Sequence, residues 1–237
     1  ITHSQSHTAA EAFHSWVQDR RATMAGGRRA SLQLPSVSAL LLLCIFSSSW
    51  GHAVAKFDPA NMTALQKHVS FFDRNKDGII TPTETFEGFV AVGCEIAFST
   101  AAATTVHTAL ALKTTPAGTP PPYLNIYVEN IHKAIHGGDT GVYDAKGRFV
   151  PQEFEGIFRK YAKIRRDALT YPEIEFMLAA NLDPLDPTSV APQVEWGLIY
   201  TLASDWLGFL HKDDIRGIYD GSVFTKLEEK RKPFSDM

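Results

Sequence analysis

Apolar side chains recur at helical spacing just ahead of an acidic segment in the first half of the chain. The positions i, i+3, i+4 and i+7 of this pattern are Leu65, His68, Val69 and Phe72. This spacing places them on one face of a helix, which a capping box at Thr63–Gln66 begins. A second helix is predicted over Thr85–Val92, so residues 63–92 form a predicted helix-loop-helix unit. By spacing alone, His68 is better explained as a core histidine bonded to the backbone than as a ligand.

A long apolar segment follows over residues 89–112, and it is rich in Ala, Val, Thr and Leu. Glu95 and His107 interrupt it, so the pattern favours a buried or interfacial helix over one that spans a membrane. The segment ends in a proline-rich turn, residues 116–122, which no helix can cross. Two uses of this turn stay open: a helical hairpin that dips into a membrane surface, and a plain loop.

Residues 150–228 are predicted to be largely helical. Leu169–Glu173 opens one helix and Val194–Tyr200 opens another, and residues 229–237 form a solvated charged tail. Together with the segments above, this pattern predicts a mainly α fold.

The first 55 residues follow a different pattern. Residues 1–23 begin with isoleucine and show no apolar period, which indicates sequence upstream of a start codon or a disordered leader. From Met24 onward come two arginines, an apolar run at Ala39–Phe46 and then small residues, the order found in a secretory signal. Residues 24–55 are therefore predicted to be a signal segment that would admit the chain to the secretory pathway, with an uncleaved anchor as the alternative.

Composition changes this picture little. Of 237 residues, 44% are hydrophobic and 21% are charged, which describes an ordinary folded protein with one main domain over residues 56–228. The net charge of -3 and the lack of a basic patch give no indication of nucleic-acid binding. The two cysteines, Cys44 and Cys94, cannot define a disulfide framework.

The acidic segment between the first two predicted helices carries the strongest chemical signal. Over twelve residues it places oxygen donors at the spacing of an EF-hand Ca²⁺ loop, with Gly78 at the sharp turn in position six. The candidate ligands are Asp73, Asn75, Asp77, Ile79 through its carbonyl, Thr81 and Glu84. The predicted fold is therefore an EF-hand helix-loop-helix, followed by a central apolar helix and the proline-rich turn.

Two later stretches repeat part of the loop pattern. Gly147–Glu153 copies the glycine, apolar, proline and glutamate positions of Gly78–Glu84, and Gly208–Asp214 repeats the glycine, apolar and acid spacing. Because EF-hand units usually pair through short strands, one hypothesis is that these degenerate loops are ion-free partners that pair Ile80 with Phe149 or Leu210. Chance similarity is the rival explanation.

A pair of histidines lies in the middle of the chain. His132 and His136 are four residues apart before Gly137-Gly138, so a helix would place them on one face. The stretch HKAIH lacks the glutamate of HExxH, which gives no support for a zinc peptidase. A metal or cofactor role for this pair stays open on the residues alone.

Three blocks together resemble a known family. They are LQKHVSFFDRNKDGIITPTETFEGF, YVENIHKAIHGGDTGVYDAKGRFVPQEFEGIFRKYA and VEWGLIYTLASDWLGFLHKDDIRGIYDGSVF, and they span about Leu65 to Phe224. This set is similar to the plant and fungal caleosins, also called peroxygenases. The resemblance implies a haem protein of lipid droplets and endoplasmic reticulum membranes, in which histidines hold the iron and a fatty-acid hydroperoxide supplies oxygen.

The family histidines fall on specific residues of this chain. The histidine before the loop falls on His68, and those of the NIHKA(x)HG block fall on His132 and His136. The resemblance therefore implies His68 and His136 as haem b ligands, with His132 as the nearest rival to His136. One histidine would be the proximal ligand and the other a distal ligand or acid/base. The chain departs from the family where Ile218 or Tyr219 replaces a common cysteine.

The function implied is that of a Ca²⁺-binding haem peroxygenase that transfers oxygen from fatty-acid hydroperoxides to unsaturated fatty acids, as in oxylipin metabolism. Its expected surroundings are the lipid droplet or the endoplasmic reticulum membrane, and an oligomer is not excluded. The alternative is a non-enzymatic Ca²⁺-binding structural or tethering protein of lipid droplets. Absence of a Soret band after haem supplementation would separate the alternative from the enzyme.

Overall fold

A computed structural model describes residues 59–186 and 191–232 of the chain. These residues belong to one compact unit, residues 57–237. The predictions for a leader over 1–23 and a signal segment or anchor over 24–55, and most of the charged tail, lie outside the described residues.

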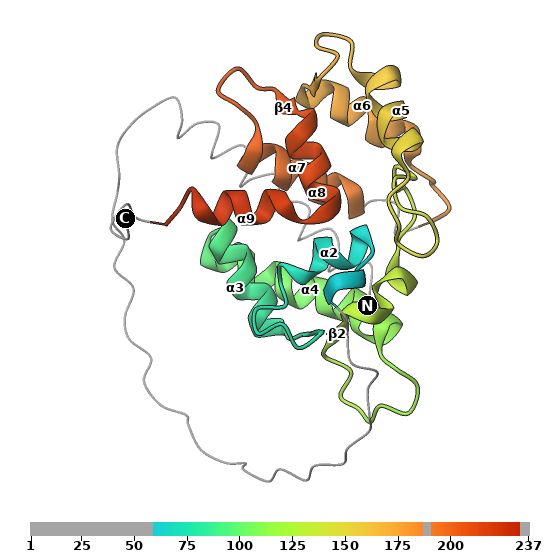
Figure 1. Cartoon of the computed structure of the whole chain (residues 1–237), viewed down its shortest axis with the longest axis vertical. Helices are drawn as coiled ribbons and strands as arrows, with labels where there is room; N and C mark the ends of the chain where they lie inside the picture. The colour runs from blue at the N-terminus through green and yellow to red at the C-terminus, as the bar shows by residue number, and fades with distance from the viewer. Residues whose placement is uncertain (1–58, 187–190, 233–237) are drawn as a thin grey trace. The chain divides into compact units, whose positions relative to one another are not determined.

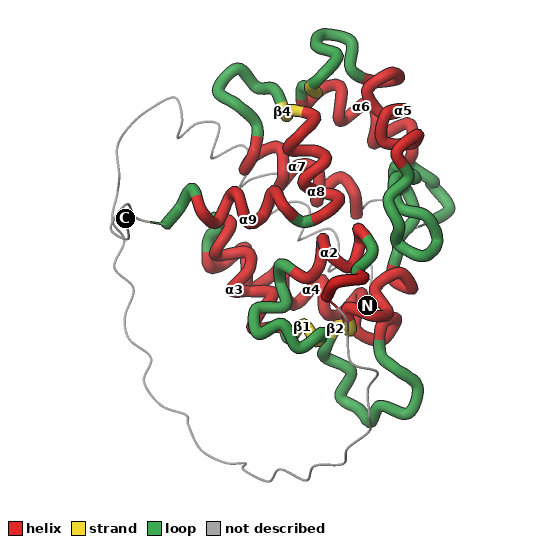
Figure 2. The backbone as a smooth tube through the Cα atoms, viewed as in Figure 1, coloured by secondary structure: helices red, strands yellow, loops and turns green. Residues whose placement is uncertain are grey.

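The described chain is mainly helical, as predicted, with four two-residue strands (Figures 1 and 2). The elements in order, with η for 3-10 helices, are η1 Pro59–Asn61, α2 Ala64–Ser70, β1 Ile79–Ile80, α3 Pro82–Val92, α4 Ile96–Thr114, β2 Ile126–Tyr127, η2 Val128–Ala134, α5 Pro151–Tyr161, β3 Ala168–Leu169, α6 Tyr171–Asn181, α7 Ala191–Ala203, β4 Leu210–His211, α8 Lys212–Asp220 and α9 Ser222–Glu229.

The first helix-loop-helix unit lies where the sequence predicts it. Thr63 caps α2, and its side chain and that of Gln66 form the expected reciprocal bonds to backbone N–H groups. Pro82 occupies the first turn of α3, where its missing N–H has no cost, so α3 begins three residues earlier than predicted. The loop between the helices thus joins two well-defined helix ends.

The apolar segment is two helices rather than one. Gly93 adopts a left-handed conformation with φ of 105° and ends α3, and α4 begins at Ile96. Glu95 is the N-cap residue of α4, and His107 is buried within it. His107 donates to Leu124 O through Nδ1 and accepts from the Thr85 hydroxyl at Nε2, so it fills a structural role. No helix in the described part of the chain is long and apolar enough to cross a membrane.

The hypothesis that Ile80 pairs with Phe149 or Leu210 is wrong. Ile80 in β1 pairs with Ile126 in β2, and the segment after the proline-rich turn supplies that strand. Phe149 instead forms a bridge with Tyr143 within its own segment. Two-residue strands carry too little pattern for the sequence to specify a partner.

The stretch Gly208–Asp214 does belong to a paired loop, but its partner is the loop before α6 and not the acidic loop. Leu210 in β4 pairs with Leu169 in β3, so the loop before α6 meets the loop before α8. Figure 1 shows α5 to α8 in the upper half of the view and α2 to α4 in the lower half, with α9 against α3. The fold therefore holds two ladders, and each joins two inter-helical loops.

The β1–β2 ladder is part of a buried apolar cluster against which α2 packs. Its buried members are Ile80, Ile126, Val128, Ile131 and Ala134. Leu65, Val69 and Phe72 from α2 and its end pack against this cluster, as the helical spacing predicts. Because burial of each large apolar side chain is worth about 1.5–3 kcal/mol, this packing fixes which face of α2 turns inward.

Candidate functional site

His68 lies where α2 packs against the turn between α8 and α9. A Cβ built on Gly221, whose φ is 80°, would lie 2.6 Å from Lys67 O and 3.0 Å from the His68 Cα, so glycine is needed for this close approach. The Phe224 ring meets the His68 ring edge-on at 5.1 Å. α2, α8 and α9 together therefore fix the position of the imidazole.

The hydrogen bond of His68 determines its tautomer. Nδ1 lies 2.6 Å from Ile218 O, and because a carbonyl only accepts, Nδ1 carries the proton. Burial lowers the pKa of His68 below its usual value despite that bond. The ring is therefore neutral near pH 7, and Nε2 presents a lone pair, as in a histidine ready to bind a metal.

His136 is held in the opposite protonation state. Nδ1 donates to Gly137 O at 2.9 Å, and Nε2 lies 3.4 Å from Glu195 Oε1. Burial works against the charge, but the hydrogen bond and charge of Glu195 outweigh it and raise the pKa of His136 to about 9. His136 is therefore an imidazolium at pH 7, with both ring nitrogens engaged.

Glu195, near the start of α7, relates the two histidines to each other. Its charge acts on both His68 and His136. Desolvation opposes ionisation of the carboxylate, but the bond and charge of His136 lower the pKa of Glu195 below its usual value. The side chain is still 60% exposed, so solvent screens the ion pair and its main effect is to orient His136.

Two tyrosines lie near the same carboxylate. Tyr219 and Thr140 share a hydrogen bond of 2.7 Å, and the Tyr143 hydroxyl donates to Tyr219 O at 2.8 Å. Burial raises the pKa of both phenols, and the charge of Glu195 adds to this. Both phenols stay protonated near neutral pH and act as neutral hydrogen-bonding groups.

Sequence reasoning missed Glu195, Tyr143 and Tyr219. These residues come from parts of the chain far apart in sequence, so no local spacing joins them. The one available signal is the block VEWGLIY, which carries Glu195: it is predicted to open a helix and belongs to the family resemblance, but nothing in its spacing relates Glu195 to a histidine.

The expectation that His132 and His136 share one helix face is wrong. The segment forms a 3-10 helix, η2, which ends at Ala134, and His136 lies beyond it. A 3-10 helix repeats every three residues, so residues four apart do not align on it. His132 lies within η2.

Asp73, Asp77 and Gly78 of the acidic loop have the local geometry of a cation-binding loop. Asp73 is fully buried and accepts N–H bonds from Asp77 at 3.1 Å and Gly78 at 2.8 Å. Gly78 has φ of 86°, which a residue with a side chain would resist. Burial raises the pKa of Asp73 above its usual value, so this carboxylate lacks a full counter-charge, which a bound cation would supply.

Glu84 is turned toward the backbone of the loop. Oε1 accepts from the N–H groups of Arg74 and Asn75, and Oε2 from the N–H and hydroxyl of Thr81. These donors outweigh desolvation and hold the pKa of Glu84 below its usual value. Accordingly, no three His, Cys, Asp or Glu side chains in the described ranges are grouped as a metal-binding cluster. The donor set still fits Ca²⁺, whose ligands are carboxylate and carbonyl oxygens.

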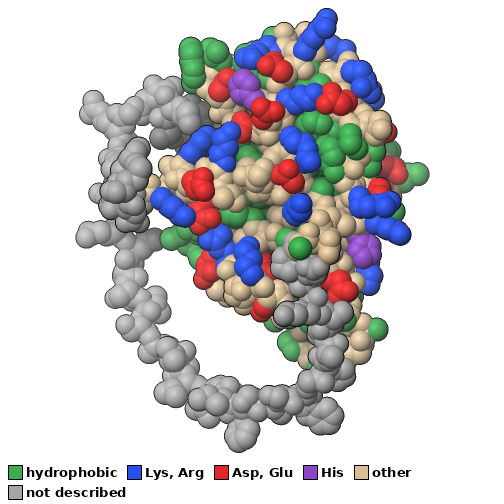
Figure 3. Space-filling view, viewed as in Figure 1, with side chains coloured by type: hydrophobic (Ala, Val, Ile, Leu, Met, Phe, Trp, Pro, Cys, Tyr) green, Lys and Arg blue, Asp and Glu red, His purple; other side chains and the backbone are tan. Residues whose placement is uncertain are grey.

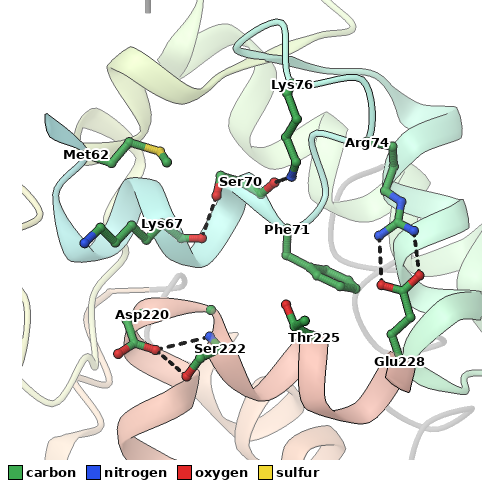
Figure 4. Close-up of a pocket in the computed structure, with 11 residues that line it drawn as sticks. Met62, Lys67, Ser70, Phe71, Arg74, Lys76, Asp220, Ser222, Thr225 and Glu228 are labelled. Atoms are coloured by element: carbon green, nitrogen blue, oxygen red, sulfur yellow. Dashed lines mark hydrogen bonds and ion pairs between the residues drawn. The ribbon is translucent and has the colours of Figure 1, made fainter. Parts of the chain in front are cut away.

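A surface pocket of about 560 Å³ joins this loop to α9 (Figure 4). Arg74 spans it and makes two hydrogen bonds to the Glu228 carboxylate, the shorter at 2.8 Å. Lys76, from the same loop as Arg74, donates to Ser70 O (Figure 4). The Arg74–Glu228 pair therefore ties the loop to α9.

The two histidines provide a candidate metal ligand and a candidate proton donor. One is a neutral histidine with an open Nε2, and the other is a cationic histidine oriented by a carboxylate. An open imidazole nitrogen suits the axial position of haem iron, and an oriented imidazolium suits proton transfer. The residues present therefore fit a haem site with one protein ligand and one acid.

Comparison with known proteins gives a consistent result. A family model described as "Caleosin related protein" matches residues 60–228. "Probable peroxygenase 4" of Arabidopsis thaliana is 48% identical over 177 residues, 74% of this chain and 91% of that protein. "Peroxygenase" of Lilium longiflorum is 44% identical over 191 residues, 76% of this chain and 80% of that protein.

A third similar protein carries a different description. "Probable inactive peroxygenase-like protein" of Arabidopsis thaliana is 47% identical over 97 residues, 40% of this chain and 47% of that protein. No solved structure matches the chain.

Proposed function

The chain belongs to the caleosin family, and on that premise we propose that it is a Ca²⁺-dependent haem peroxygenase. Its relatives support a peroxygenase role and hence an oxidoreductase enzyme. The substrates proposed are fatty-acid hydroperoxides as oxygen donors and unsaturated fatty acids as acceptors. The proposed site of action is the surface of lipid droplets or of the endoplasmic reticulum.

The observation that carries the proposal is the open Nε2 of His68. The Ile218 carbonyl holds the proton on Nδ1, so the ring needs no rearrangement to offer its other nitrogen to iron. We assign His68 as the protein ligand of haem b. The bound haem supplies the peroxide-dependent oxygen-transfer chemistry, and the residues of the chain bind, orient and move protons.

His136 is assigned as the acid beside that group. A histidine that donates from both nitrogens cannot ligate iron without losing a proton and a hydrogen bond. It can instead give the proton on Nε2 to a substrate oxygen and take a proton back from solvent, while the Glu195 carboxylate orients the ring. This assignment decides which histidine holds the iron and which acts as the acid, a choice that the sequence leaves open.

Asp73, Asn75, Asp77, Glu84, the Ile79 carbonyl and Thr81 are the proposed Ca²⁺ ligands. Asp73 follows His68 by five residues, so an ordered loop fixes the end of the helix that carries the iron ligand. Ca²⁺ is therefore assigned a structural role at the haem site.

An absorption spectrum of the full chain, purified with haem and Ca²⁺, tests the proposal. We expect a Soret band and hydroperoxide-dependent oxygen transfer. His68→Ala should remove both, and His136→Ala should keep the band while lowering turnover by about 10²-fold or more, the usual contribution of a general acid. His132→Ala is the matched control and should change neither.

Two outcomes would contradict the proposal. A Soret band of full intensity in His68→Ala would show that another residue holds the iron. A wild-type protein with no Soret band after haem supplementation, yet with Ca²⁺ binding, would favour the non-enzymatic tethering function.

A further inference from the structure

The β3–β4 ladder brings two apolar loop tips to the same edge of the fold. One loop runs from α5 to β3 and the other from α7 to β4, and their strands pair through Leu169 and Leu210. We call residues 163–167 and 205–208 the paired loop tips. Their apolar side chains point outward: Trp206 is 91% exposed, Ile164 67% and Leu207 56%.

The second tip is built to keep Trp206 exposed. Asp205 Oδ1 accepts N–H bonds at 2.9 Å from both Leu207 and Phe209, and the Gly208 N–H donates to Asp205 O at 3.0 Å. Gly208 has φ of 81°, which closes the turn. Trp206 and Leu207 therefore lie at the apex of a turn that hydrogen bonds hold in one conformation.

The first tip is fixed in a similar way. Glu173 Oε1 accepts N–H bonds from Lys163 at 2.6 Å and Ile164 at 2.9 Å. The Arg165 guanidinium lies over the Phe209 ring at 5.2 Å and links the two tips. The exposed side chains thus belong to one continuous surface.

Most of the charged side chains at this surface are positive, and Lys163 and Arg166 are exposed to solvent. Arg165 pairs with Asp167. The Asp205 carboxylate bonds the backbone of its own turn and the His211 ring. Within the described residues, Lys163 and Arg166 have no ion-pair partner, and both are exposed. The space-filling view shows hydrophobic side chains at the upper edge, beside Lys or Arg (Figure 3).

We propose that the paired loop tips are the surface by which the protein docks onto a phospholipid interface that contains anionic lipids. An indole at the apex of a turn suits the boundary between headgroups and acyl chains. Lys163 and Arg166 flank it at the level of anionic headgroups. A second copy of the chain fits less well, because a symmetric contact would oppose these cations to each other.

The docking surface lies near the proposed active site. Glu195 lies eight residues before the end of α7 at Ala203, which is about 12 Å along the helix, and the tip begins two residues later at Asp205. The inference rests on the proposed function for its lipid substrate, but it concerns a surface that shares no residue with the histidines. Docking through the tips would hold the site a short distance above the membrane.

Binding of the full chain to phosphatidylcholine vesicles, with and without phosphatidylserine, tests the proposal by co-sedimentation. Trp206→Ser with Leu207→Ser should weaken binding by about tenfold or more, because two apolar side chains leave the interface. Lys163→Glu with Arg166→Glu should weaken binding only to vesicles with phosphatidylserine. Leu185→Ser is the matched control, since Leu185 is 90% exposed but follows the far end of α6.

A second measurement places the tryptophan directly. Bromine-labelled lipids should quench the fluorescence of the wild type, and Trp206→Phe should keep vesicle binding but lose that quenching. Wild-type binding by the Trp206→Ser, Leu207→Ser variant would overturn the proposal. The proposal would also be overturned if Leu112→Ser, in α4, were the one variant that loses vesicle binding. It would be overturned, too, if the wild type bound no vesicles and instead self-associated through Trp206.

Failure of this proposal and failure of the proposed function are distinguishable. Oxygen transfer with a detergent-dispersed hydroperoxide needs no docking, so the Trp206→Ser, Leu207→Ser variant should keep wild-type turnover in that assay. Loss of the Soret band in the wild type, by contrast, would leave the vesicle-binding result unchanged.

Discussion

Glu84 and Glu173 occupy the same position in two different helix-loop-helix units. Each carboxylate accepts the N–H groups of the residues ten and nine positions before it, and the N–H and hydroxyl of the threonine three before it. The residues ahead of Glu84 are Asp73, Asn75 and Asp77. At the corresponding positions ahead of Glu173 stand Ala162, Ile164 and Arg166. One loop therefore carries the proposed cation ligands, and the other has the same closing glutamate without them.

This equivalence gives a matched pair of variants for Ca²⁺ binding. Glu84→Gln should weaken Ca²⁺ affinity by about tenfold or more, because it removes a charged ligand that can bind through two oxygens. Glu173→Gln should leave the affinity unchanged, since its loop offers no donors ahead of the glutamate. Calorimetric titration of each variant with Ca²⁺ measures the difference. Equal losses in the two variants would contradict the ligand assignment.

Glu173 also predicts a pH dependence of stability. Its N–H and hydroxyl donors outweigh desolvation and lower its pKa below the usual 4.5 in the folded protein. A lowered folded pKa contributes stability that is present above 4.5 and is lost as the pH falls through the folded pKa. Glu173→Gln should therefore reduce the free energy of unfolding by about 1–3 kcal/mol at pH 7, and by less in acid. Urea unfolding of both proteins from pH 7 to pH 3 checks this.

The His136–Glu195 pair predicts a measurable shift in the absence of haem. With Glu195→Gln, the pKa of His136 should fall from about 9 toward 6.5, because the partner charge is removed. A raised folded pKa contributes stability that is complete below 6.5 and is lost as the pH rises through about 9. Histidine resonances followed by NMR against pH report the change.

The matched control for that titration is Glu175→Gln, which removes an exposed carboxylate from α6. The pKa of His136 should not move in this variant. An unchanged pKa of His136 in Glu195→Gln would show that the ion pair does not form in solution.

Calcium removal should weaken haem retention. Without the ion, the carboxylates of Asp73 and Asp77 repel each other, and the end of α2 loses its fixed position relative to His68. We expect chelation of Ca²⁺ to increase the rate of haem transfer to apomyoglobin, and Glu84→Gln to reproduce the effect. Identical transfer rates with Ca²⁺ and with chelator would show that the two sites are independent.

The β1–β2 pairing predicts where the first unit is most sensitive. Ile126 is buried beside Ile80, so Ile126→Ala should reduce the free energy of unfolding by about 2–5 kcal/mol. Leu124→Ala removes the side chain of a half-exposed neighbour and should have a much smaller effect. Denaturant unfolding distinguishes them, and similar values would argue against the ladder.

The sequence predicted those elements that are specified by neighbouring residues. The cap at Thr63 and the turn at Gly78 both depend on contacts within a few positions. Local rules also gave the mainly helical class, because capping and apolar spacing act within one helix. The family resemblance is confirmed by the match over residues 60–228.

Features that depend on distant segments were not predictable in this way. The strand partner of Ile80 comes from Ile126, beyond a whole helix and a proline loop. Glu195 reaches His136 only because α7 folds back on the segment after η2. The protonation states of His68 and His136 follow from those contacts, so spacing could name both histidines but could not tell their roles apart.

His107 gives the proline-rich segment a mechanical property. The ring bonds Leu124 O after the prolines and Thr85 in α3, next to Glu84. A pull on that segment by a lipid or a partner would therefore be transmitted through one imidazole to the residue beside the loop's closing glutamate. Tension at one end of the fold would in this way reach the loop that carries the proposed Ca²⁺ ligands.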